Sequence, residues 1–115
     1  MRKKEEKYDF YCEEALSGKT PVKNLYESDV VLAFYHTKPS YEFHVVIIPK
    51  EHIKDLLALD KSNDSLLLEI INVAKKIVKE NIDFENLGAK LVTNMGKFQD
   101  TPHLHFHLIA GKKIR

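Results

Sequence analysis

The 115-residue chain has one cysteine and no tryptophan, and it contains no long apolar run. Its single thiol, Cys12, excludes an intramolecular disulfide and is typical of a protein from a reducing compartment. No apolar stretch approaches the ~18 residues that a membrane-spanning helix needs. The charged residues 1–7 are followed by no apolar segment, so no signal peptide is predicted. The sequence therefore predicts a cytoplasmic location and no membrane partner.

An excess of charge of either sign is also missing. The 18 Lys and Arg residues nearly balance the 17 Asp and Glu residues, which leaves a formal net charge of +1. Such a chain has no overall field to attract nucleic acid, so no nucleic-acid partner is expected. The length is that of one ordinary domain. We interpret residues 1–7 as a charged N-terminal extension and residues 8–115 as a single domain.

The pattern of apolar residues predicts strands around one long helix. From Leu66 to Val78, apolar residues recur at the spacing of a single helical face. A shorter helix is predicted over 8–17, with Gly18 suited to end it. Segments rich in β-branched and aromatic residues predict extended structure, and these are 22–26, Val30–Tyr35, Phe43–Ile48, Lys90–Thr93 and Leu104–Ala110. This order of elements predicts an α+β domain with a mainly antiparallel sheet.

Three of the six histidines, His103, His105 and His107, alternate with apolar residues near the C-terminus. On a strand, alternate side chains share one face and lie ~6.6 Å apart. We therefore expect the three imidazoles on one face, looking into a cleft or solvent because bare imidazoles are costly to bury. The residues expected on the opposite face, toward the core, are Leu104, Phe106 and Leu108.

This array of imidazoles has three interpretations. Phosphoryl or nucleotidyl transfer suits it, because a neutral imidazole is a nucleophile and its neighbours can donate protons. A metal site is the second, although adjacent residues on one flat strand do not usually converge on one ion. A solvated polar face without a role is the third.

Four blocks in the same order make the sequence resemble the histidine triad (HIT) family of nucleotide-binding hydrolases and transferases, in particular its Hint-like branch. The blocks are Tyr11-Cys12 with Gly18 and Pro21, then His44 to Ile53, then Asn94-Met95-Gly96 with Gln99, and finally His103 to Ile109. The resemblance covers about residues 8–111. It implies a HIT-like fold, in which a five-stranded antiparallel sheet carries one long and one short N-terminal helix and continues across a homodimer.

The resemblance also implies roles for individual residues. His105 matches the nucleophile that forms a covalent nucleotidyl-histidine intermediate. His103 and His107 match the histidines that support the phosphate and the leaving group, and His44 matches a fourth histidine of the same site. Asn94 and Gln99 match residues that bind phosphate or orient the site.

The nucleoside pocket of the family is matched by an aromatic segment. Phe34, Tyr35 and His36 correspond to residues that line this pocket, and Phe10 or Tyr11 are expected to contribute from the first helix. His36 stands where many members carry an Asp that holds the ribose hydroxyls.

A structural zinc site is a further implication of the resemblance. Some bacterial members bind zinc through an N-terminal Cys-x-x-Cys, the histidine of the Pro-Lys-x-His block and the first triad histidine. Here Asp9, Cys12, His52 and His103 occupy those positions, and a carboxylate is an acceptable zinc ligand. The alternative is that Cys12 is a small buried apolar residue and that His52 only begins a helical turn.

The resemblance thus implies an enzyme that cleaves a phosphoanhydride or phosphoramidate bond at the α-phosphorus of a purine nucleotide. Nucleoside phosphoramidates and dinucleoside polyphosphates are the expected substrate types, and catalysis needs no cofactor. The main alternative is a non-catalytic nucleotide-binding or sensing module. A metal-dependent hydrolase is a third possibility.

Overall fold

The computed structural model describes residues 11–18, 21–83 and 85–115. Over these ranges the chain forms five strands, one long α-helix and four short helical turns. In chain order the elements are η1 (Tyr11–Ala15), β1 (Asn24–Glu27), β2 (Val31–Tyr35), β3 (Tyr41–Pro49), η2 (Leu56–Ala58), η3 (Lys61–Asn63), α1 (Asp64–Asn81), β4 (Lys90–Thr93), η4 (Gly96–Phe98) and β5 (Phe106–Lys113). The turn η1 is π-helical, and η2 to η4 are 3₁₀ turns.

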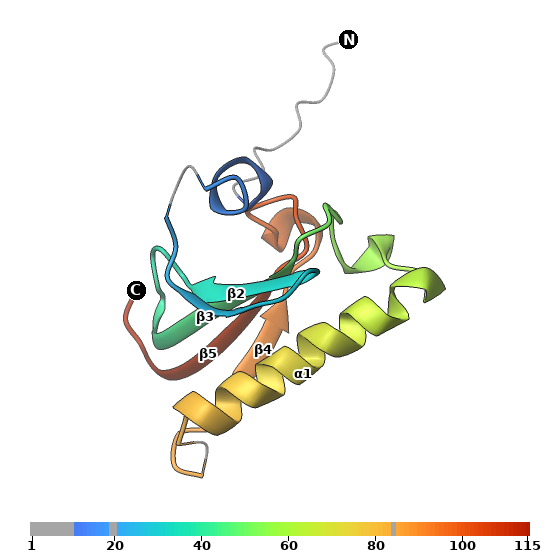
Figure 1. Cartoon of the computed structure of the whole chain (residues 1–115). Coiled ribbons are helices and arrows are strands. Elements are labelled where there is room, and N and C mark those ends of the chain that lie inside the picture. The colour runs from blue at the N-terminus through green and yellow to red at the C-terminus, as the bar shows by residue number, and fades with distance from the viewer. Residues whose placement is uncertain (1–10, 19–20, 84) are drawn as a thin grey trace.

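The five strands form a single sheet in the order β1-β2-β3-β5-β4, and every neighbouring pair is antiparallel. The predicted α+β class with a five-stranded antiparallel sheet is confirmed. The strands β3 and β5 lie at the centre (Figure 1), where Val46 is paired with His107. The two strands that carry candidate site residues are therefore held in register by a long ladder of hydrogen bonds.

The two faces of the sheet are covered by different elements. The helix α1 lies against one face and η1 lies on the opposite side (Figure 1). Alternation along β3 follows this division: Val45 and Ile47 belong to the core under α1, whereas Val46 and Ile48 belong to a smaller cluster with Tyr11. The residues of α1 buried against the sheet are Ile70, Val73, Ala74 and Ile77, which lie on the helical face predicted from the sequence.

The last strand begins later than predicted. The backbone N–H of Leu104 donates to the carbonyl of Ile53 at 2.5 Å, and that of His103 donates to Thr101 at 2.8 Å. These bonds take residues 103–105 out of the ladder with β3, so β5 starts at Phe106. The prediction that all three triad histidines lie on the strand is therefore wrong, since only His107 does.

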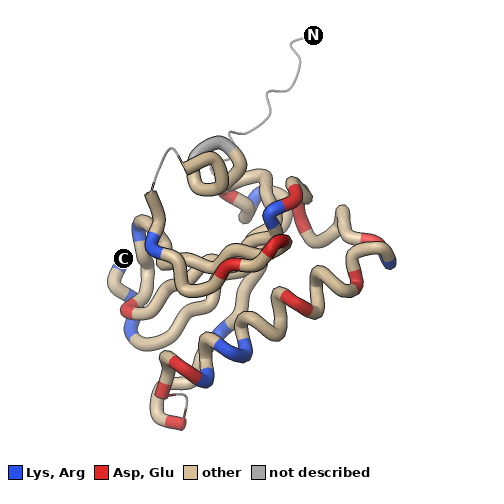
Figure 2. The backbone as a smooth tube through the Cα atoms, viewed as in Figure 1, with Lys and Arg blue, Asp and Glu red and all other residues tan. Residues whose placement is uncertain are grey.

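The charged residues lie on the outside of the fold. Figure 2 shows acidic and basic residues of both signs along α1 and the segments that flank it. This mixture fits the near-zero net charge of the chain. No helix in the described part of the chain is both long enough and apolar enough to span a membrane.

Candidate active site

The three triad histidines remain on one side of the chain although only one is in the strand. Leu104, Phe106 and Leu108 all join the core under α1, so the intervening histidines face the side that carries η1. The expectation of an open histidine face is not met, because His103 and His105 are 0% and 4% exposed. Burial is possible because both rings are hydrogen-bonded.

Backbone contacts fix the orientation of His105. Its Nδ1 lies 2.6 Å from the carbonyl oxygen of His103, and a carbonyl only accepts, so Nδ1 carries the proton. In the neutral ring Nε2 is then the unprotonated nitrogen. The hydroxyl of Thr93 donates to the carbonyl of His105 at 2.8 Å and fixes the same residue from β4. His105 therefore has the tautomer that a nucleophile requires.

His103 is oriented in the opposite sense. Its Nε2 lies 2.8 Å from the carbonyl oxygen of Pro49 and donates to it, so the bare nitrogen of the neutral ring is Nδ1. This nitrogen lies 3.2 Å from the sulfur of Cys12. Both ring nitrogens thus face protein atoms, and the contribution of His103 to His105 is made by its backbone carbonyl.

His44 and His107 form a directed pair. The backbone N–H of Ser40 donates to His44 Nδ1 at 2.9 Å, so the proton of neutral His44 is on Nε2. That nitrogen lies 2.8 Å from His107 Nδ1 and donates to it. The proton of neutral His107 is consequently on Nε2. This chain of bonds fixes one tautomer for each ring.

Both members of this pair are held neutral. Burial, followed by the neighbouring charge of His36, lowers the pKa of His44 to about 4. Burial also lowers the pKa of His107 to about 3, with smaller contributions from His105, His44 and His36. At neutral pH the pair therefore acts through hydrogen bonds and carries no charge.

His36 lies next to this pair, just past the end of β2. Its ring centroid is 4.4 Å from that of His44 and 5.8 Å from that of His107. The backbone N–H of Lys38 donates to His36 Nδ1 at 2.9 Å, so its proton is also on Nε2. Burial lowers the pKa of His36, and His105 and Arg115 lower it further while Asp100 raises it.

Tyr11 covers the nucleophile. Its ring centroid lies 5.0 Å from that of His105, 5.8 Å from that of His103 and 5.9 Å from that of Phe34. Tyr11 is itself only 5% exposed. The two residues predicted to line the nucleoside pocket on this face, Tyr11 and Phe34, are thus packed together beside the triad.

One group of possible metal ligands consists of Cys12, His52 and His103, and we call it the thiol cluster. Each residue contributes one ligating atom, and these atoms lie within 4.8 Å of one another. The sulfur lies 3.6 Å from His52 Nδ1. Because His103 Nδ1 is the bare nitrogen of its ring, the set of donors fits zinc, which favours thiolate and imidazole ligands. Asp9, the predicted fourth ligand, lies outside the described residues, as does Phe10.

A second group consists of His36, His44 and His107, and we call it the imidazole cluster. One ring nitrogen of each residue lies within 4.8 Å of the other two. Here, however, backbone N–H groups already occupy Nδ1 of His36 and of His44. Their remaining nitrogens carry protons, so binding a metal would cost these rings a hydrogen bond. The imidazole cluster is built to donate protons to a ligand.

The remaining predicted residues are distributed unevenly. Asn94 follows β4 and is half-buried, directly after Thr93. Gln99 is buried and its amide donates to the carbonyl of Lys54 at 2.6 Å, which ties the loop before the triad to the segment after β3. Tyr35 packs against Phe43 on the α1 side, so the structure does not bring it to the triad.

Sequence reasoning missed the groups that set the tautomers. They are the carbonyls of His103 and Pro49 and the backbone N–H groups of Lys38 and Ser40. The hydroxyl of Thr93, which holds the backbone of His105, was missed as well. Thr93 had a signal, since it ends a predicted strand immediately before Asn94. The backbone groups had none, because every residue except proline carries the same donor.

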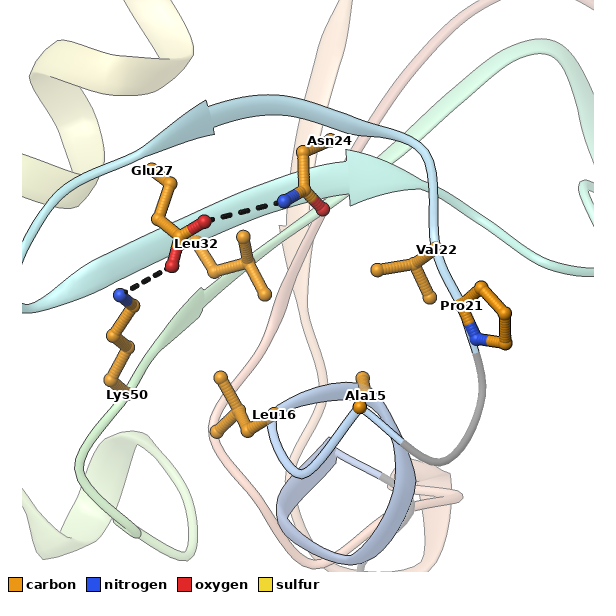
Figure 3. A pocket seen from close by; sticks show the side chains of 9 residues that line it. Ala15, Leu16, Pro21, Val22, Asn24, Glu27, Leu32 and Lys50 are labelled. Carbon is orange, nitrogen blue, oxygen red and sulfur yellow. Dashed lines mark hydrogen bonds and ion pairs between the residues drawn. The ribbon is translucent and has the colours of Figure 1, made fainter.

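A cavity of about 440 Å³ lies away from these histidines, beside η1 and β1 (Figure 3). Its apolar wall includes Leu16, Val22 and Leu32. At one end Lys50 forms a 2.6 Å ion pair with Glu27, which also accepts a hydrogen bond from an Asn24 side chain. The polar groups of this cavity thus satisfy one another, and no histidine lines it.

Comparison with known proteins identifies the family of this chain. Residues 17–114 match the HIT domain family. The chain is 31% identical over 103 residues to an uncharacterised HIT-like protein of Helicobacter pylori, which covers 88% of this chain and 95% of that protein.

Solved structures agree with this match. A HIT family hydrolase from Clostridium thermocellum is 32% identical, with a TM-score of 0.82 over 93% of both chains. A histidine triad protein from Clostridium difficile is also 32% identical, with a TM-score of 0.80 over 93% of both chains. A histidine triad nucleotide-binding protein from Candida albicans is 33% identical, with a TM-score of 0.77 over 92% of this chain and 76% of its own. This chain belongs to the HIT family.

Proposed function

We propose that this protein is a nucleotide hydrolase or transferase that cleaves a phosphoanhydride or phosphoramidate bond at the α-phosphorus of a purine nucleotide. The observation that carries the proposal is the hydrogen bond from His105 Nδ1 to the carbonyl of His103, because it places the ring proton on Nδ1 and makes Nε2 the unprotonated, nucleophilic nitrogen. The names of relatives as a hydrolase and as a nucleotide-binding protein support the same class.

In the first step, the lone pair of His105 Nε2 attacks the α-phosphorus and forms a P–N bond. The bond from phosphorus to the leaving group breaks, and its electron pair departs with the leaving group. The His103 carbonyl, already bonded to Nδ1–H, stabilises the positive charge that develops on the ring. In the second step water attacks phosphorus and releases a proton to solvent, the P–N bond breaks, and its electron pair returns to Nε2.

The His44–His107 pair serves the atoms around this phosphorus. His107 Nε2–H is positioned to donate a hydrogen bond to a phosphoryl oxygen or to the leaving group, while His44 keeps the ring of His107 in that tautomer. Asn94 is expected to donate an amide hydrogen to the phosphate. These roles need no metal, since imidazoles supply both the nucleophile and the proton donor.

The test is turnover of adenosine and guanosine phosphoramidates and of dinucleoside polyphosphates by the wild type and by His105→Asn. We expect the variant to lose turnover, and a brief reaction of the wild type to show a nucleotidyl adduct on His105 by mass spectrometry. Equal rates for both proteins would exclude this nucleophile. Tight nucleotide binding without any turnover would favour the binding module, and loss of activity in EDTA would favour a metal-dependent hydrolase.

The thiol cluster supports a separate proposal, a structural zinc ion held by Cys12, His52 and His103. The bound ion would supply no step of the reaction. It would tie η1 to the segment after β3 and to the start of the triad, since its ligands come from these three places. A zinc content near zero in protein purified without chelator would contradict this proposal.

A homodimer is also expected. A groove of about 350 Å³ with a mainly apolar lining runs between α1 and β4, which is an edge strand. Leu91 on β4 is 38% exposed beside it, and an apolar edge of this kind is suited to pairing with a second chain. Light scattering should report a dimer for the wild type and a monomer for Leu91→Lys, whereas a monomeric wild type would contradict the expectation.

A further inference from the structure

The imidazole cluster extends the site past the residues that the proposed reaction uses. His44 and His107 form the directed pair described above, and His36 lies beside them with its centroid 4.4 Å from that of His44. The ring centroid of His107 is 5.8 Å from that of His36 and 4.9 Å from that of His105, so the three rings are neighbours in one site. His36 is half-buried, so part of its ring is open to a ligand.

The free donor of His36 is defined by its backbone partner. Lys38 N–H occupies Nδ1 at 2.9 Å, which leaves Nε2–H as the group that the ring offers. The pair beside it offers a second donor of the same kind, Nε2–H of His107. Two imidazole N–H groups side by side suit a ligand whose atoms accept hydrogen bonds, and phosphate oxygens are strong acceptors.

A permanent positive charge adjoins these donors. The side chain of Arg115 donates from Nε to the carbonyl of Pro39 at 2.7 Å, and the N–H of Ile114 donates to the carbonyl of Ser40. These bonds hold Ile114 and Arg115 against the loop between β2 and β3, which includes His36, and the Arg115 charge helps to lower the pKa of His36. Asp100 is the carboxylate that opposes it.

We propose that His36 and Arg115 form a subsite for a second phosphate group of the substrate, next to the phosphate that His105 attacks. Arginine is well suited to this role because its guanidinium matches two phosphate oxygens and stays charged at all relevant pH values. His36 donates from Nε2, and an incoming phosphate favours its charged form. The inference rests on the proposed function, because it takes the first phosphate to lie at His105.

A second phosphate can come from two parts of a nucleotide, namely a polyphosphate chain or a phosphate on the ribose. The shared chemistry is a dianionic group within reach of His36 and Arg115. We therefore expect substrates with two phosphates to bind more tightly than substrates that place a neutral amine or an unmodified ribose in this subsite.

The experiment measures binding and not turnover, so it uses the full chain with His105→Asn to prevent reaction. Calorimetry would compare AMP with ADP and with adenosine 3′,5′-bisphosphate. We expect one of the two diphosphorylated ligands to bind about tenfold more tightly than AMP, as expected for one charge-assisted contact. The ligand that gains affinity identifies the source of the second phosphate.

Variants then assign the gain to residues. Added to His105→Asn, Arg115→Gln should abolish the preference while leaving AMP affinity within about twofold. His36→Gln should abolish the preference as well, and His36→Asp should reverse it through repulsion of the phosphate. Lys23→Gln is the matched control, because it also removes one positive charge but Lys23 lies over Tyr35 on the α1 side.

Equal affinities for all three ligands in the parent protein would overturn the subsite. It would also be overturned if the His36 and Arg115 variants, shown to be folded by circular dichroism, weakened AMP and the diphosphorylated ligands equally. Either result would leave the role of His105 intact, because that role is tested by turnover and by the covalent adduct.

Discussion

Two groups of three potential metal ligands lie near His105 in the described part of the chain. In the thiol cluster and in the imidazole cluster alike, the ligating atoms lie within 4.8 Å of one another. They differ in the cysteine of the thiol cluster and in the hydrogen bonds that the backbone makes with their histidines. A carbonyl oxygen faces His103 in the thiol cluster, whereas N–H groups face His36 and His44 in the imidazole cluster.

The partner of one ring nitrogen decides the chemistry of the other. In His103, Nε2 donates its proton in a hydrogen bond to the carbonyl of Pro49. The unprotonated nitrogen, Nδ1, therefore faces the cluster, where a metal can bind to it. A backbone N–H does the reverse for His44 and leaves a proton inside the cluster. Distances between histidines therefore do not by themselves separate a metal site from a proton-donating site.

The largest expected contrast is in catalysis. His107→Asn removes the hydrogen-bond donor that the imidazole cluster offers the phosphate and should lower kcat by about 10²- to 10³-fold, the usual contribution of one donor to a developing negative charge. His52→Asn changes the thiol cluster and should leave kcat within a few-fold of the wild-type value. The measurement is the steady-state rate of each variant, after its folding has been checked. Similar losses in both variants would contradict the division of roles.

The next contrast is in zinc affinity. Cys12→Ser should weaken zinc binding by about 100-fold or more, since even indirect partners of a zinc ligand contribute 10- to 100-fold. His36→Asn should leave the affinity unchanged, because the N–H groups of its cluster oppose a metal. Titration with a competing chromophoric chelator measures both. A loss in His36→Asn as large as in Cys12→Ser would show that the imidazole cluster binds the metal.

A third contrast concerns pH. With folded pKa values of about 4 and 3, His44 and His107 should show no change in their imidazole NMR signals between pH 8 and 5.5. Because the unfolded histidines take up protons near pH 6.5 and the folded ones do not, the free energy of unfolding should fall as the pH is lowered from 6.5 toward 4.

A variant checks that this pH dependence comes from the pair. His44→Gln should flatten the decrease in the free energy of unfolding measured by urea denaturation at several pH values. The groups around the pair are His36, His105, Tyr41, Arg115 and Asp100, and they remain in this variant. An unchanged slope would assign the pH dependence to them.

The smallest effect is expected outside both clusters. Lys50→Met breaks the ion pair with Glu27 in the cavity of Figure 3, whose ends are open to solvent. Exposed ion pairs contribute about 0–1 kcal/mol to stability, so the melting temperature should change little. kcat should not change at all, and a large loss of activity would connect this cavity to the site.

The sequence predicted the parts of this site that depend on local periodicity. Alternation in the last segment placed Leu104, Phe106 and Leu108 in the core, and the same rule placed Val46 opposite Val45 on β3. Local rules could not show that Leu104 N–H would bond to Ile53, because this contact joins distant parts of the chain. Because of that bond, β5 starts later than predicted, and His103 and His105 lie outside the strand.

Burial of the triad was unpredictable for a related reason. The expectation of an open histidine face came from the cost of burying bare imidazoles. In the fold, the carbonyl oxygen of Pro49 on β3 and the sulfur of Cys12 on η1 lie against the two ring nitrogens of His103, and Tyr11 packs against His105. The partners that remove the cost come from elements that only the tertiary structure brings together.

Tyr11 and Cys12 are consecutive residues of one π-helical turn, and one covers His105 while the other contacts His103. The packing beside the nucleophile and the packing of the thiol cluster therefore depend on one turn of the chain. A zinc ion bound to Cys12 would restrain that turn and, with it, the ring of Tyr11. Zinc binding and ligand binding at His105 should therefore change one another's affinity by the same factor.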